Sequence, residues 1–404
     1  MADGARSEDP AVQHQLTRLA ALSLGGDRLG LERVTVLLGR LGDPQDALPP
    51  VLHVAGTNGK GSTCAFLRAG LEAAGLTAHV FTSPHLVRYN ERIRLGGRLI
   101  DDVHLAALLG EVLDIGADLE PSFFEATTAA AFLAFSRTPA DALVLEVGLG
   151  GRLDATNVVA RPAACGIASV GIDHQSWLGD TLGEIAREKA GIARLGVPFI
   201  ALAQPSEALA AIEAMTAERG APLLLEGRDW TLDESLRPTL PGAHQVRNAN
   251  LAWQMLSAAA LPVTVDQYRT GLATAYWPAR LQPLADGPLT VGRDIVVDGA
   301  HNADAARALA AHLAYDPRHL ILGMLANKDA PAIVRTLRPH ALSLTFVSIP
   351  AHDSHSPVAL ANRFGGRASA SLLDALDGLP SPILIAGSLY LAGEALRANL
   401  EFPD

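Results

Sequence analysis

A glycine-rich turn that joins an apolar run to a helical pattern constrains this chain more than any other feature. Residues 51–55 predict a buried strand, and residues 62–74 predict a helix that ends at Gly75. The turn between them consists of Gly56, Thr57, Asn58, Gly59, Lys60, Gly61 and Ser62. Its glycines let backbone N–H groups approach phosphate oxygens, which the positive end of the helix also faces. Lys60 adds a cation and the Ser62 hydroxyl suits magnesium, so the turn predicts a site for ATP.

The other apolar runs alternate with helical patterns, which is typical of a mainly parallel sheet covered on both faces. After opening helices at 13–24 and 31–41, further strands are predicted at 78–82, 142–147, 164–170 and 197–202. A second block has strands at 294–298, 319–322, 343–349 and 382–386, with a helix at 302–313. We therefore predict an α/β protein. A phosphate-loop ATPase-type domain covers residues 1–284, a linker lies within 283–288, and a smaller Rossmann-like domain covers residues 289–404.

Composition narrows the class of function. Acidic residues outnumber Lys and Arg by 43 to 32, and the net charge of −11 argues against nucleic acid as the main partner. No run approaches the roughly 18 apolar residues of a membrane span, and the polar, acidic residues 1–10 do not resemble a signal peptide. Two cysteines, Cys64 and Cys165, fit a reducing compartment. We expect a cytoplasmic protein that binds neither nucleic acid nor membrane.

Polar side chains follow or end three more predicted strands, where a parallel sheet displays its site. Ser83 follows the second strand, Glu146 lies inside the third, and His174 comes after the fourth. An unpaired carboxylate among apolar residues is costly, so Glu146 is expected to have a partner. Beside a triphosphate, these groups suggest magnesium binding. Oxygen ligands are preferred by magnesium, so the spacing alone is equally consistent with a structural His174.

Three further segments carry charge in unusual settings. Residues 148–157 combine closely spaced glycines with an Arg, an Asp and an Asn, a set that a plain loop does not explain. Lys189 follows a helical stretch, and a surface or ion-paired lysine is its simplest interpretation. Four arginines then lie within eleven residues: Arg88, Arg92, Arg94 and Arg98. They suit either a carboxylate-bearing substrate or a solvated loop or hairpin.

In the second block, residues 298–302 end a strand and open a helix. Asp298 suits a ribose hydroxyl or a metal-bound water. His301 and Asn302 suit phosphate or an incoming amine, and an N-cap is the alternative for Asn302.

These motifs, in this order, resemble the Mur-ligase superfamily and, within it, the bacterial dihydrofolate synthase/folylpolyglutamate synthase family. The matching segments span nearly the whole chain, and residues 83–94 and 145–157 are the most specific. The other matches are 29–34, 56–62, 173–179, 187–192, 277–282, 298–302 and 387–388. Ala303 departs from the family, which has Pro there, and this leaves the start of the following helix open.

The resemblance implies a role for each matching residue. It places ATP on the glycine-rich turn, with further contacts from Asn248, or alternatively Asn250, and from Arg280 and Asp298 on opposite sides of the domain boundary. It implies magnesium binding by Ser83, Glu146 and His174, with a second metal site completed by carbamylation of Lys189. It implies a dihydropteroate pocket of Leu29, Gly30, Leu31, Ser122, Phe123, Phe124, Glu125, Leu153, Asp154 and Ala155. Ser388 and His301 are candidates for the glutamate pocket, and Lys60, Lys189 and His301 form the implied catalytic set.

The activity implied by the resemblance is that of an ATP-dependent acid–amino-acid ligase of folate biosynthesis. Such an enzyme joins L-glutamate to dihydropteroate, and to tetrahydrofolate as a polyglutamate, through an acyl phosphate. ATP and Mg²⁺ are the implied cofactors. Dihydropteroate, reduced folates and L-glutamate are the implied partners of a monomeric enzyme.

Other classes remain to be weighed against this prediction. A glycine-rich turn without phosphate is one, because Gly61 separates Lys60 from Ser62 and so departs from the common phosphate-loop pattern. Residues 327–329, Asn-Lys-Asp, suggest a GTPase switch, although the spacer of a guanine-reading motif is missing. A protein that senses a nucleotide without catalysing a reaction is a third alternative class. A cell-wall Mur enzyme needs an additional domain before the turn, for which the 55 preceding residues are too few. A related ligase that joins another acid to an amino acid also fits.

Overall fold

The computed structural model describes residues 5–23 and 29–404, and the chain divides into two compact units. The first unit comprises residues 1–239, 243–276 and 404, and the second comprises residues 240–242 and 277–403. The division falls before Trp277, earlier than the linker predicted within 283–288. The reason is that β9 (Gln282–Pro283) pairs antiparallel with β10 (Ile295–Val297) and so belongs to the second unit.

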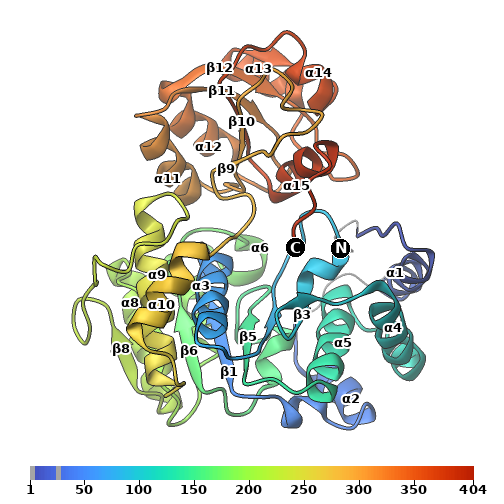
Figure 1. Ribbon diagram of the computed structural model, residues 1–404, viewed down its shortest axis with the longest axis vertical. Helices are drawn as coiled ribbons and strands as arrows, with labels where there is room; N and C mark the ends of the chain where they lie inside the picture. The colour runs from blue at the N-terminus through green and yellow to red at the C-terminus, as the bar shows by residue number, and fades with distance from the viewer. Residues whose placement is uncertain (1–4, 24–28) are drawn as a thin grey trace. The chain divides into compact units, whose positions relative to one another are not determined.

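An eight-stranded sheet, in the order β4-β3-β2-β5-β1-β6-β7-β8, organises the first unit (Figure 1). Its strands are β1 (Val51–Ala55), β2 (Ala78–Phe81), β3 (Ile93–Leu95), β4 (Arg98–Leu99), β5 (Ala142–Glu146), β6 (Ala164–Ile167), β7 (Phe199–Ala201) and β8 (Leu223–Leu225). The pairs are parallel except for the antiparallel pairs β2–β3 and β3–β4. All five residues of β1 are buried, because helices cover both faces.

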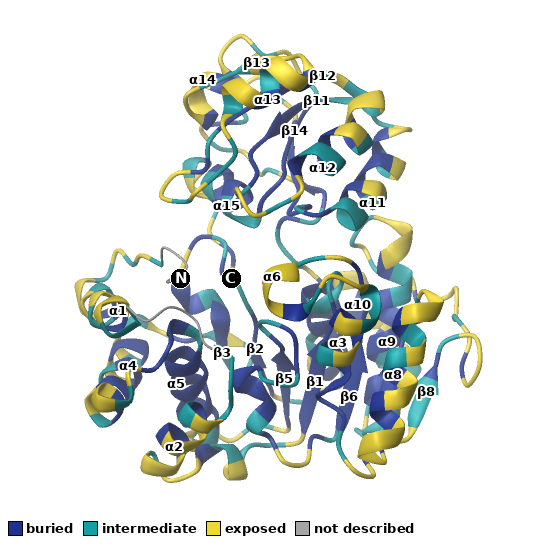
Figure 2. Cartoon of the chain, turned by 180° about the vertical axis from the view of Figure 1, so that it is seen from behind, coloured by how far each residue is buried: buried dark blue, intermediate teal, exposed yellow. Residues whose placement is uncertain are grey.

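The two faces of this sheet carry different helices. One face is covered by α3 (Lys60–Ala73), α9 (Ala243–Ala258) and α10 (Val265–Thr274). The other is covered by α5 (Phe123–Arg137), α7 (Leu182–Ala190) and α8 (Ser206–Arg219), with α1 (Pro10–Leu22), α2 (Glu32–Arg40) and α4 (Asp102–Gly116) packed beside α5. Figure 2 shows the strands and the inner helix faces as buried. Short helices are α6 (Gln175–Leu178), η2 (Pro44–Ala47), η3 (Tyr89–Arg92), η4 (Ala117–Leu119) and η5 (Ala155–Val158).

The second unit is built on a six-stranded sheet in the order β13-β12-β11-β14-β10-β9. Its other strands are β11 (Arg318–Leu322), β12 (Ala341–Phe346), β13 (Arg367–Ala368) and β14 (Ile383–Ala386). Its helices are α11 (Ala303–Leu313), α12 (Ala330–Leu337), η6 (Arg338–His340), α13 (Pro357–Phe364), α14 (Leu372–Leu376) and α15 (Leu389–Ala398). Parallel strands with helical crossovers confirm the α/β class and the second, smaller domain.

Most of the predicted elements are present within a few residues of their predicted bounds. The end of the first helix, predicted at residues 24–26, lies outside the described residues. Within the described part of the chain, no helix has the length and apolar character needed to cross a membrane.

Candidate nucleotide and ligase site

The glycine-rich turn leaves β1 and enters α3 through backbone conformations that favour glycine. Gly56 has a φ of 147°, and Gly59, the N-cap of α3, has a φ of 92°. A Cβ on Gly59 would lie 2.5 Å from Oδ1 of Asn248, and one on Gly56 would lie 3.0 Å from Cβ of Ala168. The turn therefore has room for hydrogen and not for a side chain. This allows its backbone N–H groups to lie close to a bound anion.

The cation and the hydroxyl of the motif lie at the start of α3. The Nζ of Lys60 donates to the carbonyl oxygen of Gly56 at 3.2 Å, which holds the ammonium group over the turn. Ser62 is buried, and the Thr63 hydroxyl donates to the carbonyl oxygen of Gly59 at 2.9 Å. Partial positive charge at a helix N-terminus adds to that of the lysine, so this end of α3 suits an anion.

The structure distinguishes between Asn248 and Asn250 on α9. Asn248 is buried and its side-chain oxygen lies against Gly59 of the turn, while its Nδ2 donates to Gln245 at 3.1 Å. Asn250 instead bonds to the backbone of Asp233 and Val246. Asn248 is therefore the residue of the pair that faces the turn, and Asn250 anchors the helix.

Replacing Gly59 with Ala should weaken nucleotide binding by more than about tenfold while the chain still folds. The new Cβ meets Asn248 at 2.5 Å and sits on a backbone with positive φ, which costs about 1–2 kcal/mol. Calorimetric titration with ADP and Mg²⁺ measures the effect. Gly75→Ala is the matched control, because Gly75 has a φ of 78° with nothing within 4 Å of its added Cβ. Equal losses in the two variants would show that backbone strain, and not the turn, sets the affinity.

Two of the three predicted metal ligands lie together at the ends of neighbouring strands. The Ser83 N–H donates to Oε2 of Glu146 at 3.3 Å, and Glu146 is buried at the end of β5. His174 follows β6 in a left-handed conformation, and its side chain is 42% exposed. In the described residues, no group of three His, Cys, Asp or Glu side chains is placed to hold a metal. The predicted set contains only two residues of those types and a hydroxyl, and it stays a prediction.

Lys189 lies on α7 and is 5% exposed, so a surface position is wrong, while an ion-paired lysine, the other form of its simplest interpretation, stays a prediction. The loop of residues 148–157 lies against the backbone of α7 at this position. A Cβ on Gly151 would lie 2.7 Å from the carbonyl oxygen of Lys189, and the Arg152 N–H donates to the carbonyl oxygen of Glu188 at 2.7 Å. The Arg152 guanidinium also pairs with the Glu188 carboxylate at 2.9 Å. Glycine at position 151 thus lets the loop approach the backbone of α7.

His53, which the sequence analysis did not single out, joins β1 to the same loop. Its Nε2 lies 2.9 Å from the Thr156 hydroxyl, which in turn donates to Oδ1 of Asp154 at 2.5 Å. Because the hydroxyl proton goes to Asp154, Nε2 of His53 must carry a proton and donate it. Burial, aided by the charge of Arg194, lowers the pKa of His53 to about 3, so the imidazole is neutral. A histidine inside an apolar strand was the available signal.

Asp154 holds the loop together from inside. Its Oδ2 accepts from the Leu149 N–H at 2.8 Å, and its Oδ1 accepts from the Thr156 N–H at 3.0 Å. Burial raises the pKa of this carboxyl, and the bonds from Thr156 and Leu149 oppose that effect.

The segments of the predicted dihydropteroate pocket also meet in the first unit. Ser122 and Glu125 form a capping box at the start of α5, and Glu125 pairs with Arg33 of α2 at 2.7 Å. A Cβ on Gly148 would lie 2.4 Å from the Phe124 ring, so this ring lies against the loop of residues 148–157. The pair Arg33–Glu125 therefore connects the segment of Leu29, Gly30 and Leu31 to α5.

The four arginines make different contacts. Arg92 is buried, donates from Nε to Nδ1 of His85 at 2.9 Å, and lies over the Phe123 ring. Arg94 and Arg98 belong to the β3–β4 hairpin, and burial lowers the pKa of Arg94 to about 10. Arg88 pairs with Asp102 at 3.4 Å. Arg94 and Arg98 therefore lie in a hairpin as expected, with Arg98 exposed to solvent and Arg94 partly buried.

In the second unit, Asp298 ends β10 with both carboxylate oxygens on backbone donors. They accept from the N–H groups of Leu281 at 2.9 Å and Ala300 at 2.8 Å. A Cβ on Gly299 would lie 2.7 Å from Nη1 of Arg280. The expectation that Arg280 and Asp298 come from opposite sides of the domain boundary is wrong, because both lie in the second unit.

The remaining candidates of this unit cap helices or turns. Nδ1 of His301 lies 2.8 Å from the carbonyl oxygen of Gly299. Asn302 accepts from the Ala305 N–H at 2.9 Å, which confirms the N-cap interpretation, and α11 begins at Ala303 without a proline. The buried Ser388 accepts from the Tyr390 N–H at 3.1 Å as the N-cap of α15. Asp329 of the Asn-Lys-Asp segment is likewise the N-cap of α12.

The fold and the turn define a phosphate-loop nucleotide-binding α/β protein. A search of family descriptions found no match. The chain is 34% identical to folylpolyglutamate synthase of Lacticaseibacillus casei, covering 98% of each chain. It is 37% identical to dihydrofolate synthase/folylpolyglutamate synthase of Escherichia coli over 77% of this chain and 75% of that one.

Comparison with solved structures gives the same family. Escherichia coli FolC in complex with DHPP and ADP has a TM-score of 0.86 at 30% identity, covering 96% of this chain and 97% of that one. Mycobacterium tuberculosis folylpolyglutamate synthase complexed with ADP has a TM-score of 0.87 at 28% identity, covering 96% and 100%. The chain belongs to the dihydrofolate synthase/folylpolyglutamate synthase family. It is therefore an ATP-dependent ligase and not a GTPase switch or a non-catalytic sensor.

Proposed function

We propose that this enzyme joins L-glutamate to dihydropteroate, giving dihydrofolate, and to tetrahydrofolate, giving a polyglutamate. The observation that carries the proposal is the glycine-rich turn with Lys60, which follows β1, next to the strand that ends at Glu146 and its partner Ser83, in a chain of this family. The relatives' names include both activities, and one related structure holds Mn, AMPPNP and L-glutamate.

The chemistry explains why ATP is needed. A carboxylate repels nucleophiles and has no good leaving group. Transfer of the γ-phosphoryl group breaks its bond to the bridging oxygen of ATP and forms a bond to the carboxylate, which yields an acyl phosphate and ADP. The glutamate amine then attacks the carbonyl carbon, and the tetrahedral intermediate releases inorganic phosphate and a proton. Lys60 binds and neutralises the migrating phosphoryl group.

Ser83, Glu146 and His174 are the residues that would hold Mg²⁺. A hydroxyl and a buried carboxylate, brought together by the bond from the Ser83 N–H to Glu146, form a donor set that this ion accepts. When bound, the ion neutralises charge on the phosphates. We assign Lys189, which is buried and whose backbone lies against the loop of residues 148–157, to carbamylation and a second metal site. Asn248 is assigned to the nucleotide because its side chain lies against Gly59, and Arg280 and Asp298 are assigned to it through the family resemblance.

The substrates are assigned to separate units. The segments containing Leu31, Phe124 and Asp154 form the pteroate pocket of the first unit, supported by the Arg33–Glu125 pair. His301 and Ser388 are assigned to glutamate in the second unit. Free, buried cysteines support a reducing compartment, and we propose a cytoplasmic monomer, which size-exclusion chromatography tests for mass.

The decisive assay is release of ADP by the purified enzyme with dihydropteroate or tetrahydrofolate, each with and without L-glutamate. We expect ADP release with either acid only when glutamate is present, together with one amide product per ADP. Activity with tetrahydrofolate alone would reduce the proposal to polyglutamylation. ADP release without amide product would contradict it.

A further inference from the structure

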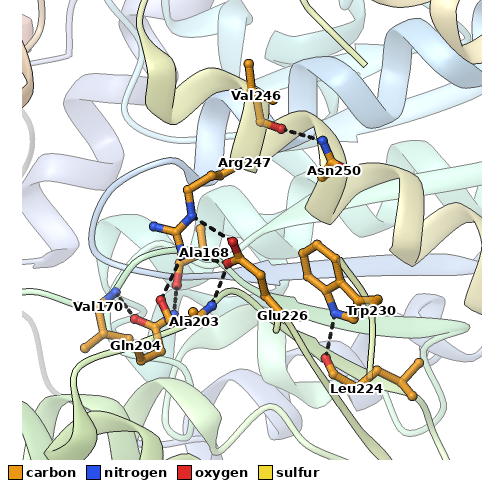
Figure 3. Close-up of polar contacts among 10 residues, drawn as sticks. All are labelled: Ala168, Val170, Ala203, Gln204, Leu224, Glu226, Trp230, Val246, Arg247 and Asn250. Atoms are coloured by element: carbon orange, nitrogen blue, oxygen red, sulfur yellow. Dashed lines mark hydrogen bonds and ion pairs between the residues drawn. The ribbon is translucent and has the colours of Figure 1, made fainter. Parts of the chain in front are cut away.

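An ion pair between Arg247 of α9 and Glu226, which follows β8, holds the backbone of Ala203 beyond the end of β7. Nη2 of Arg247 lies 2.6 Å from Oε2 of Glu226, and Nε lies 3.1 Å from Oε1 (Figure 3). The same two side chains hold both sides of Ala203. Its N–H donates to Glu226 at 2.7 Å, and its carbonyl oxygen accepts from Arg247 at 2.9 Å. The position of Ala203 is therefore fixed by an arginine and a glutamate from two other elements.

The next residue, Gln204, holds the segment that follows β6. Its Oε1 accepts from the Val170 N–H, and its Nε2 donates to the carbonyl oxygen of Ala168, both at 2.9 Å (Figure 3). A side-chain amide supplies an acceptor and a donor from one planar group, which suits this pair of bonds. Ser169 lies between these two bonds, so Gln204 fixes Ser169 on both sides.

Ser169 in turn holds the glycine-rich turn. Its carbonyl oxygen accepts from the N–H groups of Thr57 at 2.8 Å and Asn58 at 3.3 Å, and its hydroxyl donates to the carbonyl oxygen of Asn58 at 3.1 Å. The Thr57 hydroxyl adds bonds to both backbone groups of Gly171. A continuous set of hydrogen bonds thus runs from Arg247 and Glu226 to the turn.

The same ion pair is also connected to the glycine-rich turn through α9. Arg247 precedes Asn248, whose side chain lies against Gly59. Asn250, two residues further along α9, bonds to the backbone of Asp233 beyond β8. The N-terminal part of α9 is therefore anchored beyond the carboxyl ends of β7 and β8, and Asn248 is placed from there.

We propose that Gln204 and the Arg247–Glu226 pair are positioning residues for nucleotide binding, acting on the turn through Ser169 and on Asn248 through α9. The inference rests on the proposed binding of ATP at this turn. The Arg247 side chain is 35% exposed but that of Glu226 is only 10% exposed, so the removal of Arg247 also lowers stability. Nucleotide affinity is therefore compared only among variants that remain folded.

The test is calorimetric titration of the full chain with ADP and Mg²⁺, together with steady-state kinetics. Gln204→Leu and Arg247→Met should each raise the Kd for ADP and the KM for ATP by about tenfold, which is about 1.4 kcal/mol at 25 °C. The KM for the carboxylic acid substrate should stay within about twofold. Arg247→Lys, which retains the charge, should recover part of the affinity.

Arg137→Met is the matched control, because Arg137 of α5 forms a bidentate ion pair with Glu111 of α4 in the same unit. It should leave ADP affinity unchanged. Circular dichroism establishes that each variant is folded at the assay temperature. If Gln204→Leu does not fold, Gln204→Glu replaces it, since it keeps the acceptor and loses the donor to Ala168.

ADP affinity within twofold of wild type in both folded variants would overturn the inference and leave the proposed function standing. Equal rises in the KM values for ATP and for the acid would overturn it too, because they indicate a general structural defect. Absence of ADP binding by the wild type would overturn the proposed function and this inference together.

Discussion

Lys60→Ala should lower kcat by about 10²–10³-fold, because a preorganised charge on the migrating phosphoryl group is lost. The fold should survive. The Nζ of Lys60 makes one hydrogen bond, to the Gly56 carbonyl oxygen, and losing such a bond costs about 1 kcal/mol. ADP release in the presence of dihydropteroate and L-glutamate measures the rate, and thermal unfolding measures the stability.

Arg40→Ala is the control for the loss of one positive charge. Arg40 pairs with Asp118 on the surface of the first unit, away from the turn. Its removal should leave kcat unchanged. A folded Lys60→Ala enzyme that turns over at nearly the wild-type rate would remove Lys60 from the catalytic set.

Acidification should destabilise the first unit through His53. The pKa of His53 falls from 6.5 to about 3 on folding. Between these two pH values the unfolded chain is protonated at His53 and the folded chain is not, so acid favours unfolding. The stability from this group is complete above about pH 6.5 and is lost as the pH falls towards 3. At about 1.4 kcal/mol per pH unit, the loss is about 2 kcal/mol at pH 5 and about 5 kcal/mol near pH 3.

His53→Gln isolates this contribution, because the amide nitrogen of glutamine can donate to Thr156 but does not titrate. Other groups change charge in the same range. The pKa of His79 is also lowered by burial, and the raised pKa of Asp154 acts with the opposite sign. Urea unfolding, followed by tryptophan fluorescence, is therefore measured for wild type and His53→Gln at pH 7 and pH 5. The slopes compared are the changes in the free energy of unfolding per pH unit in the two proteins. Equal slopes would show that His53 does not cause the acid sensitivity.

The sheet of the first unit was predictable because its central strands are buried on both faces and therefore appear as unbroken apolar runs. The hairpin of β3 and β4 was predicted only as one alternative for the four arginines, since its strands have three and two residues and carry arginines. The domain boundary was misplaced for a similar reason. The two residues of β9, Gln282 and Pro283, have no apolar pattern, and only their pairing with β10 assigns them to the second unit.

Within the site, local chemistry was predictable and long-range contacts were not. Glycines with positive φ follow from the turn itself, as at Gly59. The choice of Asn248 over Asn250 depends on which side of α9 faces that glycine, and this is set by packing between distant segments. Gly151 lies against the backbone of Lys189, 38 residues away, and the partner of His53 lies 103 residues away at Thr156. Such pairs have no signature in a single sequence.

The order β2-β5-β1-β6 has a consequence for how this enzyme could acquire new substrates. The segments that begin at Ser83, Gly148, Gly56 and Ala168 leave four adjacent strands in turn, whereas the apolar side chains of those strands hold the sheet together. If the proposed pteroate pocket is correct, selectivity for the acid and stability of the sheet depend on different stretches of the chain. Randomising Leu149, Arg152 and Leu153, which are not buried, while keeping the buried Asp154, Ala155, Thr156 and Asn157, should yield libraries in which most members remain folded while their preference among carboxylic acids diverges.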